Sequence, residues 1–179
     1  MTYDFGLVGL GVMGRNFILN VAQNGFSSIG LSSNQNAINL LKSDGKSYEV
    51  DGTLDDKDFF QRLKRPRKIM LLVPAGKPVD SVIDRFLPYL EEGDIIIDGG
   101  NSHYDDTDRR YSFLKDKKIN FIGAGVSGGS KGARIGPSIM PGCDLDIYEQ
   151  IRPIFESASA KVNGDPCVTY LGNTSSGHY

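Results

Sequence analysis

One stretch near the start of the chain constrains its fold more than any other. It is a G-x-G-x-x-G loop formed by Gly9, Leu10, Gly11, Val12, Met13 and Gly14. A short apolar run over residues 3–8 precedes the loop, and residues 15–24 follow it with apolar side chains at helical spacing until Gly25. A strand, a glycine loop and a helix in this order are typical of a dinucleotide site, where the N–H groups that begin the helix face the pyrophosphate. The alternative is a structural turn in some other α/β protein.

Composition and charge narrow the class of protein. The chain has 179 residues, of which 39% are hydrophobic and 23% charged, and this suits one globular domain over residues 1–179. Its formal net charge of −2 predicts no general attraction to nucleic acid or to an anionic membrane. We expect no membrane span and no signal peptide, because the chain shows neither apolar pattern. Cys143 and Cys167 lack metal-ligand spacing and suit packing roles, so we predict no metal site, no disulfide framework and a cytoplasmic location.

Strand patterns and helix patterns alternate along most of the chain. This alternation predicts a doubly wound, mainly parallel α/β sheet of the Rossmann type. The glycine-rich stretch 123–142 is expected to be irregular, residues 105–115 form a polar surface helix, and Pro153 bends or divides the helix over 144–157. Further strands are expected at 26–31, 50–53, 68–73, 94–98, 119–124 and 168–171, and further helices at 36–42, 54–63 and 78–93.

Ligands of an open α/β sheet bind beyond the carboxyl ends of its strands, so the residues after each strand are the candidates for chemistry. The second strand is followed by an uncharged triplet, Ser32, Ser33 and Asn34, where an NAD site usually has an acidic residue and an NADP site an arginine. These side chains could bind a ribose hydroxyl, cap the next helix, or do both.

Three later strands end in small loops that expose their backbone. The loops contain Pro74, Ala75 and Gly76; Gly99, Gly100, Asn101 and Ser102; and Ser127, Gly128 and Gly129. Asn101 offers a donor and an acceptor, and Ser127 offers a hydroxyl beside two N–H groups, so the loops could hold a polyhydroxylated acid next to a nicotinamide. Structural turns are the alternative. Lys131 and Arg134 could hold a phosphate or carboxylate, and solvated surface charges are the simpler interpretation.

Several motifs occur in an order and spacing that resemble the N-terminal domain of the decarboxylating 6-phosphogluconate dehydrogenases. They are the loop 9–16, Asp98-Gly99-Gly100-Asn101, residues 125–129 and 132–134, Gly-Pro-Ser-Ile-Met-Pro-Gly at 136–142, and Gly-His-Tyr at 177–179. The resemblance covers nearly the whole chain. It implies a step of the pentose phosphate pathway: oxidation of 6-phosphogluconate at C3 with hydride transfer to NADP, loss of CO2, and protonation to ribulose 5-phosphate.

The resemblance also implies roles for individual residues. Substrate contacts would come from Asn101, Ser127, Gly128 and Gly129. Cofactor contacts would come from Gly9, Leu10, Gly11, Val12, Met13, Gly14, Arg15, Ser32, Ser33, Asn34, Val73, Pro74, Ala75 and Asn101.

The chain departs from the family pattern in charge and in length. Ser33 stands where the family has an arginine for the 2′-phosphate, and Ala37 and Pro74 replace lysines. The resemblance implies NADP as the cofactor. A lost charge-assisted contact costs about 1.5–3 kcal/mol, so NAD stays the open alternative. The family's general base, a lysine, and its general acid would lie beyond Tyr179. We therefore expect residues 1–179 to contain no catalytic residue and to bind cofactor without turnover.

The sequence leaves alternatives open for the oligomeric state and for the function. The family's dimer contacts would lie mostly beyond Tyr179, so we expect a homodimer for the full-length protein and a monomer or a weak association for residues 1–179. His103 and His178 form no nucleophile–base pattern in the sequence. The rival functions are another β-hydroxyacid dehydrogenase, against which Asp98-Gly99-Gly100-Asn101 argues, and a stand-alone NAD(P)-sensing module.

Overall fold

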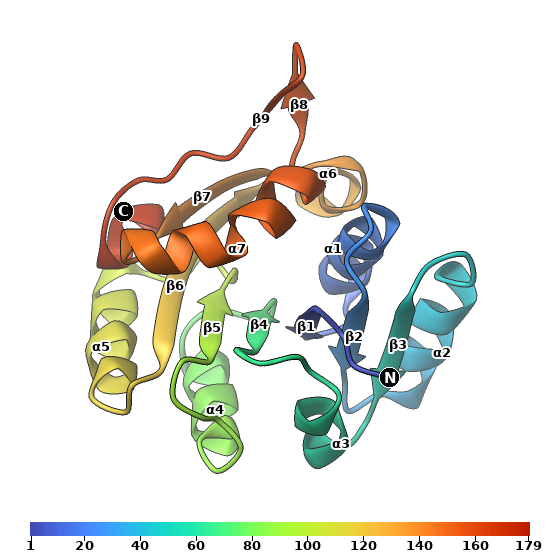
Figure 1. The fold of residues 1–179 in the computed structure, drawn as a ribbon, viewed down its shortest axis with the longest axis horizontal. Helices are drawn as coiled ribbons and strands as arrows, with labels where there is room; N and C mark the ends of the chain where they lie inside the picture. Colours follow the sequence, from blue (N-terminus) through green and yellow to red (C-terminus); the bar gives the residue numbers. More distant parts are fainter.

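A seven-stranded sheet forms the centre of the computed structural model, which describes residues 1–179 (Figure 1). The strand order is β3-β2-β1-β4-β5-β6-β7, and all neighbours are parallel except β6 and β7. The strands are β1 (Phe5–Val8), β2 (Ser28–Leu31), β3 (Val50–Thr53), β4 (Lys68–Leu71), β5 (Ile95–Asp98), β6 (Asn120–Ser127) and β7 (Ser138–Gly142). The doubly wound, mainly parallel sheet that the sequence predicts is confirmed.

Helices connect most of the strands, as crossovers between parallel strands require. They are α1 (Val12–Gln23), α2 (Gln35–Asp44), α3 (Asp56–Gln61), α4 (Lys77–Phe86), α5 (Tyr104–Lys115), α6 (Gly129–Ile135) and α7 (Leu145–Ala158). A ribbon of β8 (Lys161–Val162) and β9 (Asp165–Pro166) projects from the body, and the 3-10 turn η1 (Thr174–Gly177) brings the last residues beside α5 (Figure 1). None of the helices has the length and apolar character that a membrane crossing requires.

Each face of the sheet has its own apolar layer, because successive strand residues point to opposite faces. Ile95 and Ile97 pack on the face covered by α1 and α7, against side chains such as Phe17 and Phe155. Ile96 packs on the opposite face with α3, α4 and α5. All three isoleucines are completely buried. Burial on both faces explains why the strand is a continuous apolar run rather than an alternating one.

The stretch 123–142 is regular, so the expectation of irregular structure is wrong. It contains the end of β6, the whole of α6 and the whole of β7. A Cβ on Gly125 would lie 2.6 Å from the Gly177 oxygen, and one on Gly142 would lie 2.5 Å from the Gly177 nitrogen. Glycine in these strands marks the close approach of another backbone rather than a loop.

The strand expected at residues 168–171 does not form. Val168 makes an isolated bridge to Ile139, and the segment runs along β7 with hydrogen bonds from Thr169 N to Ile139 O and from Leu171 N to Pro141 O. Pro141 has no N–H to donate in return, so the ladder stays incomplete.

Two helices also differ from expectation. Pro153 does not divide α7, which continues over Leu145–Ala158 with Ile151 and Phe155 buried on either side of the proline. Packing of that apolar face outweighs the one hydrogen bond that a proline removes. Helix α5 is not simply a surface helix, because its Arg110 is only 1% exposed.

Candidate functional site

The glycine loop lies between β1 and α1, and each glycine has a separate geometric role. Gly9 has a φ of 98°, and a Cβ there would lie 2.4 Å from the Leu72 oxygen. A Cβ on Gly14 would lie 1.9 Å from the Gly9 oxygen, whereas one on Gly11 would meet nothing within 4 Å. Gly9 and Gly14 therefore keep the turn tight, and Gly11 leaves open space in front of the helix. Gly11 is the N-cap of α1 and no side chain caps it, so the loop fits a pyrophosphate.

The other residues of the loop present different groups to that space. The Leu10 side chain is buried in the core, so only its backbone can face a cofactor. Val12 is exposed, and Met13 is half-buried. The Nε atom of Arg15 lies 3.3 Å from the carboxylate of Asp44 on α2. This ion pair directs the Arg15 side chain toward the end of α2.

The triplet after β2 forms the cap of α2. Asn34 is the N-cap residue, and its side chain accepts a hydrogen bond of 2.9 Å from the Asn36 N–H. The Ser32 hydroxyl accepts one of 3.1 Å from the Asn34 N–H. The capping role that the sequence left open is therefore confirmed for Asn34. Ser33 is exposed at the head of the turn.

A cavity of about 210 Å³ adjoins Ser33 and the glycine loop. Val73 and Val82 line it with apolar surface, and α3 and α4 contribute Asp56 and Arg85. The Asp56 carboxylate and the Arg85 Nε lie 3.2 Å apart. Arg85 supplies the only positive charge among the lining residues, and sequence reasoning missed it because it considered strand ends and not helix faces. We call this space the adenosine-side cavity, since it borders β2 and the turn after it, the place where such folds usually bind the adenosine ribose.

The loops after β4 and β5 lie on the other side of β1. Pro74 and Ala75 are exposed in the first loop. Asp98, the last residue of β5 before the second loop, is completely buried. Its carboxylate accepts hydrogen bonds from the Gly100 N–H at 2.9 Å and from the Ser102 hydroxyl at 2.6 Å. Asp98 therefore shapes this loop from inside and does not face a ligand.

Asn101 joins the β5 loop to the end of β6. Its Nδ2 donates to the Val126 carbonyl at 3.1 Å, and its Oδ1 accepts from the Val126 N–H at 2.9 Å. The residue has a φ of 54°, which asparagine tolerates better than most side chains. Asn101 is exposed, so its second N–H and lone pair stay free for a ligand. Because Val126 precedes Ser127, the structure brings the predicted substrate residues together.

The turn after β6 lies close to the start of α1. Ser127, Gly128 and Gly129 are exposed, and the two glycines have φ values of 139° and 61°. Asn16 of α1 donates from Nδ2 to the Ser130 carbonyl at 2.8 Å. This bond, absent from the sequence reasoning, fixes the turn beside the glycine loop.

The two basic residues after this turn behave as surface charges. Lys131 is exposed. Arg134 donates to the Gln23 Oε1 at 2.6 Å and lies over the Tyr48 ring, so it is directed along α1 and away from the turn.

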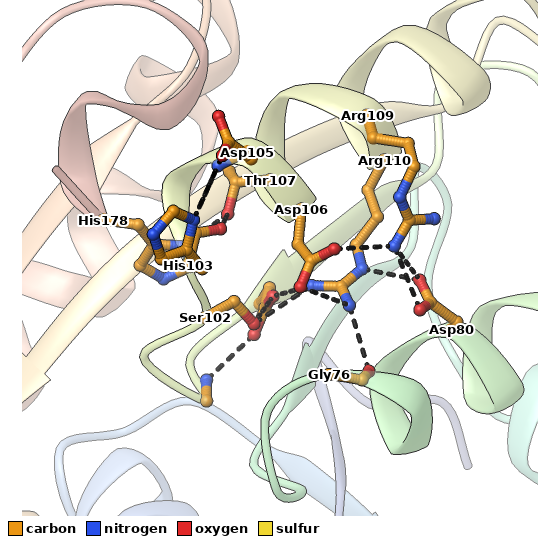
Figure 2. Close-up of polar contacts among 12 residues, drawn as sticks. Gly76, Asp80, Ser102, His103, Asp105, Asp106, Thr107, Arg109, Arg110 and His178 are labelled. Atoms are coloured by element: carbon orange, nitrogen blue, oxygen red, sulfur yellow. Dashed lines mark hydrogen bonds and ion pairs between the residues drawn. The ribbon is translucent and has the colours of Figure 1, made fainter.

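The sequence reasoning also missed a histidine contact near Asn101. The Nδ1 atom of His178 lies 2.7 Å from the Thr107 hydroxyl on α5, and its Nε2 has no partner within the chain (Figure 2). A Cβ on Gly123 would lie 3.2 Å from the same Nδ1, so glycine in β6 makes room for the ring. Asn101 and His178 share a cavity of about 200 Å³. The glycines at alternate positions 123 and 125 were the available signal.

Both cysteines are free thiols, of which Cys143 is buried and Cys167 half-buried. Burial raises the pKa of the Cys143 thiol to about 12, as expected for a packing residue. No group of three or more His, Cys, Asp or Glu side chains is placed to hold a metal ion.

The fold and the glycine loop define an NAD(P)-binding domain of the doubly wound class. Comparison with known proteins identifies the family. A model for the NAD-binding domain of 6-phosphogluconate dehydrogenase matches residues 4–172. The chain belongs to this family, and the resemblance seen in its motifs is confirmed.

Individual relatives agree with that assignment. The "6-phosphogluconate dehydrogenase, decarboxylating 1" of Saccharomyces cerevisiae is 51% identical over all of this chain and 37% of its own length. The NAD(+)-dependent decarboxylating 6-phosphogluconate dehydrogenase of Bacillus subtilis is 50% identical over all of this chain and 38% of its own. The structure of Plasmodium falciparum 6-phosphogluconate dehydrogenase has a TM-score of 0.94 at 41% identity and covers 98% of this chain and 38% of that one. The chain thus spans little more than a third of the length of these relatives.

Proposed function

We propose that residues 1–179 form the cofactor-binding domain of a decarboxylating 6-phosphogluconate dehydrogenase. The observation that carries the proposal is the Asn101–Val126 bridge, which places the turn after β6 beside the β5 loop. An uncapped helix with open space at Gly11 lies next to that turn. The relative from Plasmodium falciparum was solved with its cofactor NADP+ and with its substrate 6-phosphogluconate, and this supports both ligands.

We assign each predicted site residue a role that fits its position at the edge of the sheet. The dinucleotide would supply the acceptor for the hydride. Its pyrophosphate would be held by Gly9, Leu10, Gly11, Val12, Met13, Gly14 and Arg15, its adenosine ribose by Ser32, Ser33 and Asn34, and its nicotinamide half by Val73, Pro74, Ala75 and Asn101. The hydroxyls of the sugar acid would be held by Asn101, Ser127, Gly128 and Gly129.

NADP is the proposed cofactor, with NAD as the alternative. Ser33 carries no charge, and Arg85 is the one positively charged residue that lines the adenosine-side cavity. The relative from Plasmodium falciparum has NADP+ as its cofactor, while the one from Bacillus subtilis is named NAD(+)-dependent. Titration of the chain with NADP+ and NAD+ at one salt concentration tests the choice. Tighter binding of NADP+ is expected, and equal or tighter binding of NAD+ would contradict it.

Turnover would require residues outside this span, including the general base and general acid. More than half of each relative's length lies outside the aligned region. With NADP+ and 6-phosphogluconate, residues 1–179 should bind cofactor and form no NADPH, whereas the complete enzyme should form it. Faster turnover of a short hydroxyacid by the complete enzyme would favour another β-hydroxyacid dehydrogenase, and no turnover of any hydroxyacid would favour the NAD(P) sensor.

Location and assembly belong to the same proposal. Two free thiols suit the reducing cytoplasm. We expect the complete protein to sediment as a homodimer and residues 1–179 as a monomer or a weakly associating species. A tight dimer of residues 1–179 would place dimer contacts on this domain.

A further inference from the structure

Arg110 has the largest of the fully buried side chains, and each of its three guanidinium nitrogens donates a hydrogen bond (Figure 2). Nε donates to Asp80 at 2.8 Å. Nη1 donates to the Asp98 carboxylate at 3.2 Å and to the Ser102 hydroxyl at 3.0 Å. Nη2 donates to the Gly76 carbonyl at 3.0 Å. One side chain from α5 thus reaches α4 and the loops after β4 and β5.

Those two loops carry residues assigned above to the nicotinamide half of the cofactor. Gly76 follows directly on Ala75, and Asp98 and Ser102 lie on either side of Asn101. Asp98 has no solvent exposure, and its carboxylate also orders the backbone of its own loop through Gly100. The Arg110 guanidinium therefore bonds groups on both sides, in addition to the direct backbone contact from the Gly99 N–H to the Leu71 carbonyl at 3.0 Å.

We propose that Arg110 is a positioning residue for the nicotinamide half of the cofactor site. It holds the loops after β4 and β5 at the separation that binding requires, and Asp98 serves as its buried counter-ion. The inference rests on the proposed function. The strand order keeps the β5 loop apart from the adenosine-side cavity, which is lined by the turn after β2 and, from the β4 side, by Val73 and α4.

Stability alone does not account for a buried arginine at this place. Apolar side chains of similar volume often replace a buried ion pair without loss of stability. They could not donate to two carboxylates, a hydroxyl and a carbonyl at once, whereas the guanidinium has five N–H donors in a fixed plane. The arrangement suits the alignment of two loops.

The test measures the two halves of the site separately. Three proteins are titrated with NADPH and with 2′,5′-ADP: wild type, Arg110→Lys and Arg109→Gln. If wild type prefers NADH, the two probes are NADH and ADP instead. Lysine keeps the charge and loses the planar set of donors. Arg109 is the matched control, because it bonds Asp80 and Asp106 at 3.0 Å, is 56% exposed and reaches neither loop.

We expect Arg110→Lys to bind the whole dinucleotide about tenfold or more weakly than wild type, because this loss corresponds to one or two hydrogen-bonded contacts. Its affinity for the adenosine half should stay within about twofold of the wild-type value. Arg109→Gln should match wild type with both probes. A variant that is merely less stable would lose both ligands together.

A milder variant keeps the test decisive if Arg110→Lys does not fold. Ser102→Ala removes one donor–acceptor contact of the network and should weaken binding of the dinucleotide alone by about two- to fivefold. Equal losses for both probes, or unchanged affinity for the dinucleotide, would overturn the inference. Failure of folded wild type to bind either probe would contradict the proposed function instead.

Discussion

The two sides of the glycine loop are built in different ways. On the adenosine side, Ser33 is exposed and uncharged, and Arg85 pairs with Asp56 while half of its side chain stays exposed. On the nicotinamide side, Asp98 and Arg110 are buried and bonded to each other and to both loops. Exposed pairs contribute about 0–1 kcal/mol, while breaking a buried pair costs about 3–5 kcal/mol. In the proposed site, cofactor preference and loop geometry would therefore depend on separate residues, of which only the first set is easily exchanged.

The largest effect is expected when the buried side loses its cation. Arg110→Met should lower the free energy of unfolding by about 3–5 kcal/mol, because the charge of Asp98 is left buried without its partner. Urea unfolding measures this loss, and Arg109→Gln should stay within about 0.5 kcal/mol of wild type. A loss below about 1 kcal/mol for Arg110→Met would show that the two sides are equally tolerant.

On the exposed side, Ser33→Arg should change binding and leave stability unaltered. A new charge-assisted contact of about 1.5–3 kcal/mol would tighten NADP+ binding by roughly 10- to 100-fold. NAD+ lacks the 2′-phosphate, so its affinity should stay the same. Ser33→Gln is the control of similar length without charge. Equal tightening of both cofactors would mean that residue 33 does not face the 2′-phosphate.

A smaller change is expected from the ion pair in the adenosine-side cavity. Asp56→Asn releases Arg85 from its partner 3.2 Å away, so NADP+ should bind up to about fivefold more tightly, the equivalent of about 1 kcal/mol. Arg85→Gln should weaken NADP+ binding by a similar factor. Calorimetric titration measures the NADP+ affinity of both variants, and titration of the same variants with NAD+ is the reference. Unchanged NADP+ affinity in both variants would remove Arg85 from the cofactor site.

The smallest effect concerns the rim of the buried network. The hydrogen bond from Arg110 lowers the pKa of Asp80 below its ordinary value of 3.8. A carboxyl group with a lowered folded-state pKa contributes stability above its unfolded pKa and loses it as the pH falls through the folded value. Asp80→Asn should therefore be less stable than wild type near neutral pH, and the difference should shrink below about pH 4. Thermal unfolding over this pH range is the measurement, and a pH-independent difference would argue against an ionised Asp80 in the network.

The sequence by itself determined the class of fold and the centre of the site. The run Ile95, Ile96, Ile97 predicted a buried apolar strand, and the spacing of Gly9, Gly11 and Gly14 predicted the turn that the structure contains. These features depend on backbone preference and on the periodicity of a few neighbouring residues. Both can be recognised without knowing what packs against them.

Only the tertiary structure decided which polar residues are buried and what they hold. Arg110 belongs to a helix that looks polar in sequence, and its partners Asp98 and Asp80 are 12 and 30 residues away. The glycines at 123 and 125 suggested a loop, until the segment around Gly177 was found to pack against their strand. A charge can be buried, or a Cβ excluded, only by groups that folding brings from distant parts of the chain, and local sequence patterns carry no record of those partners.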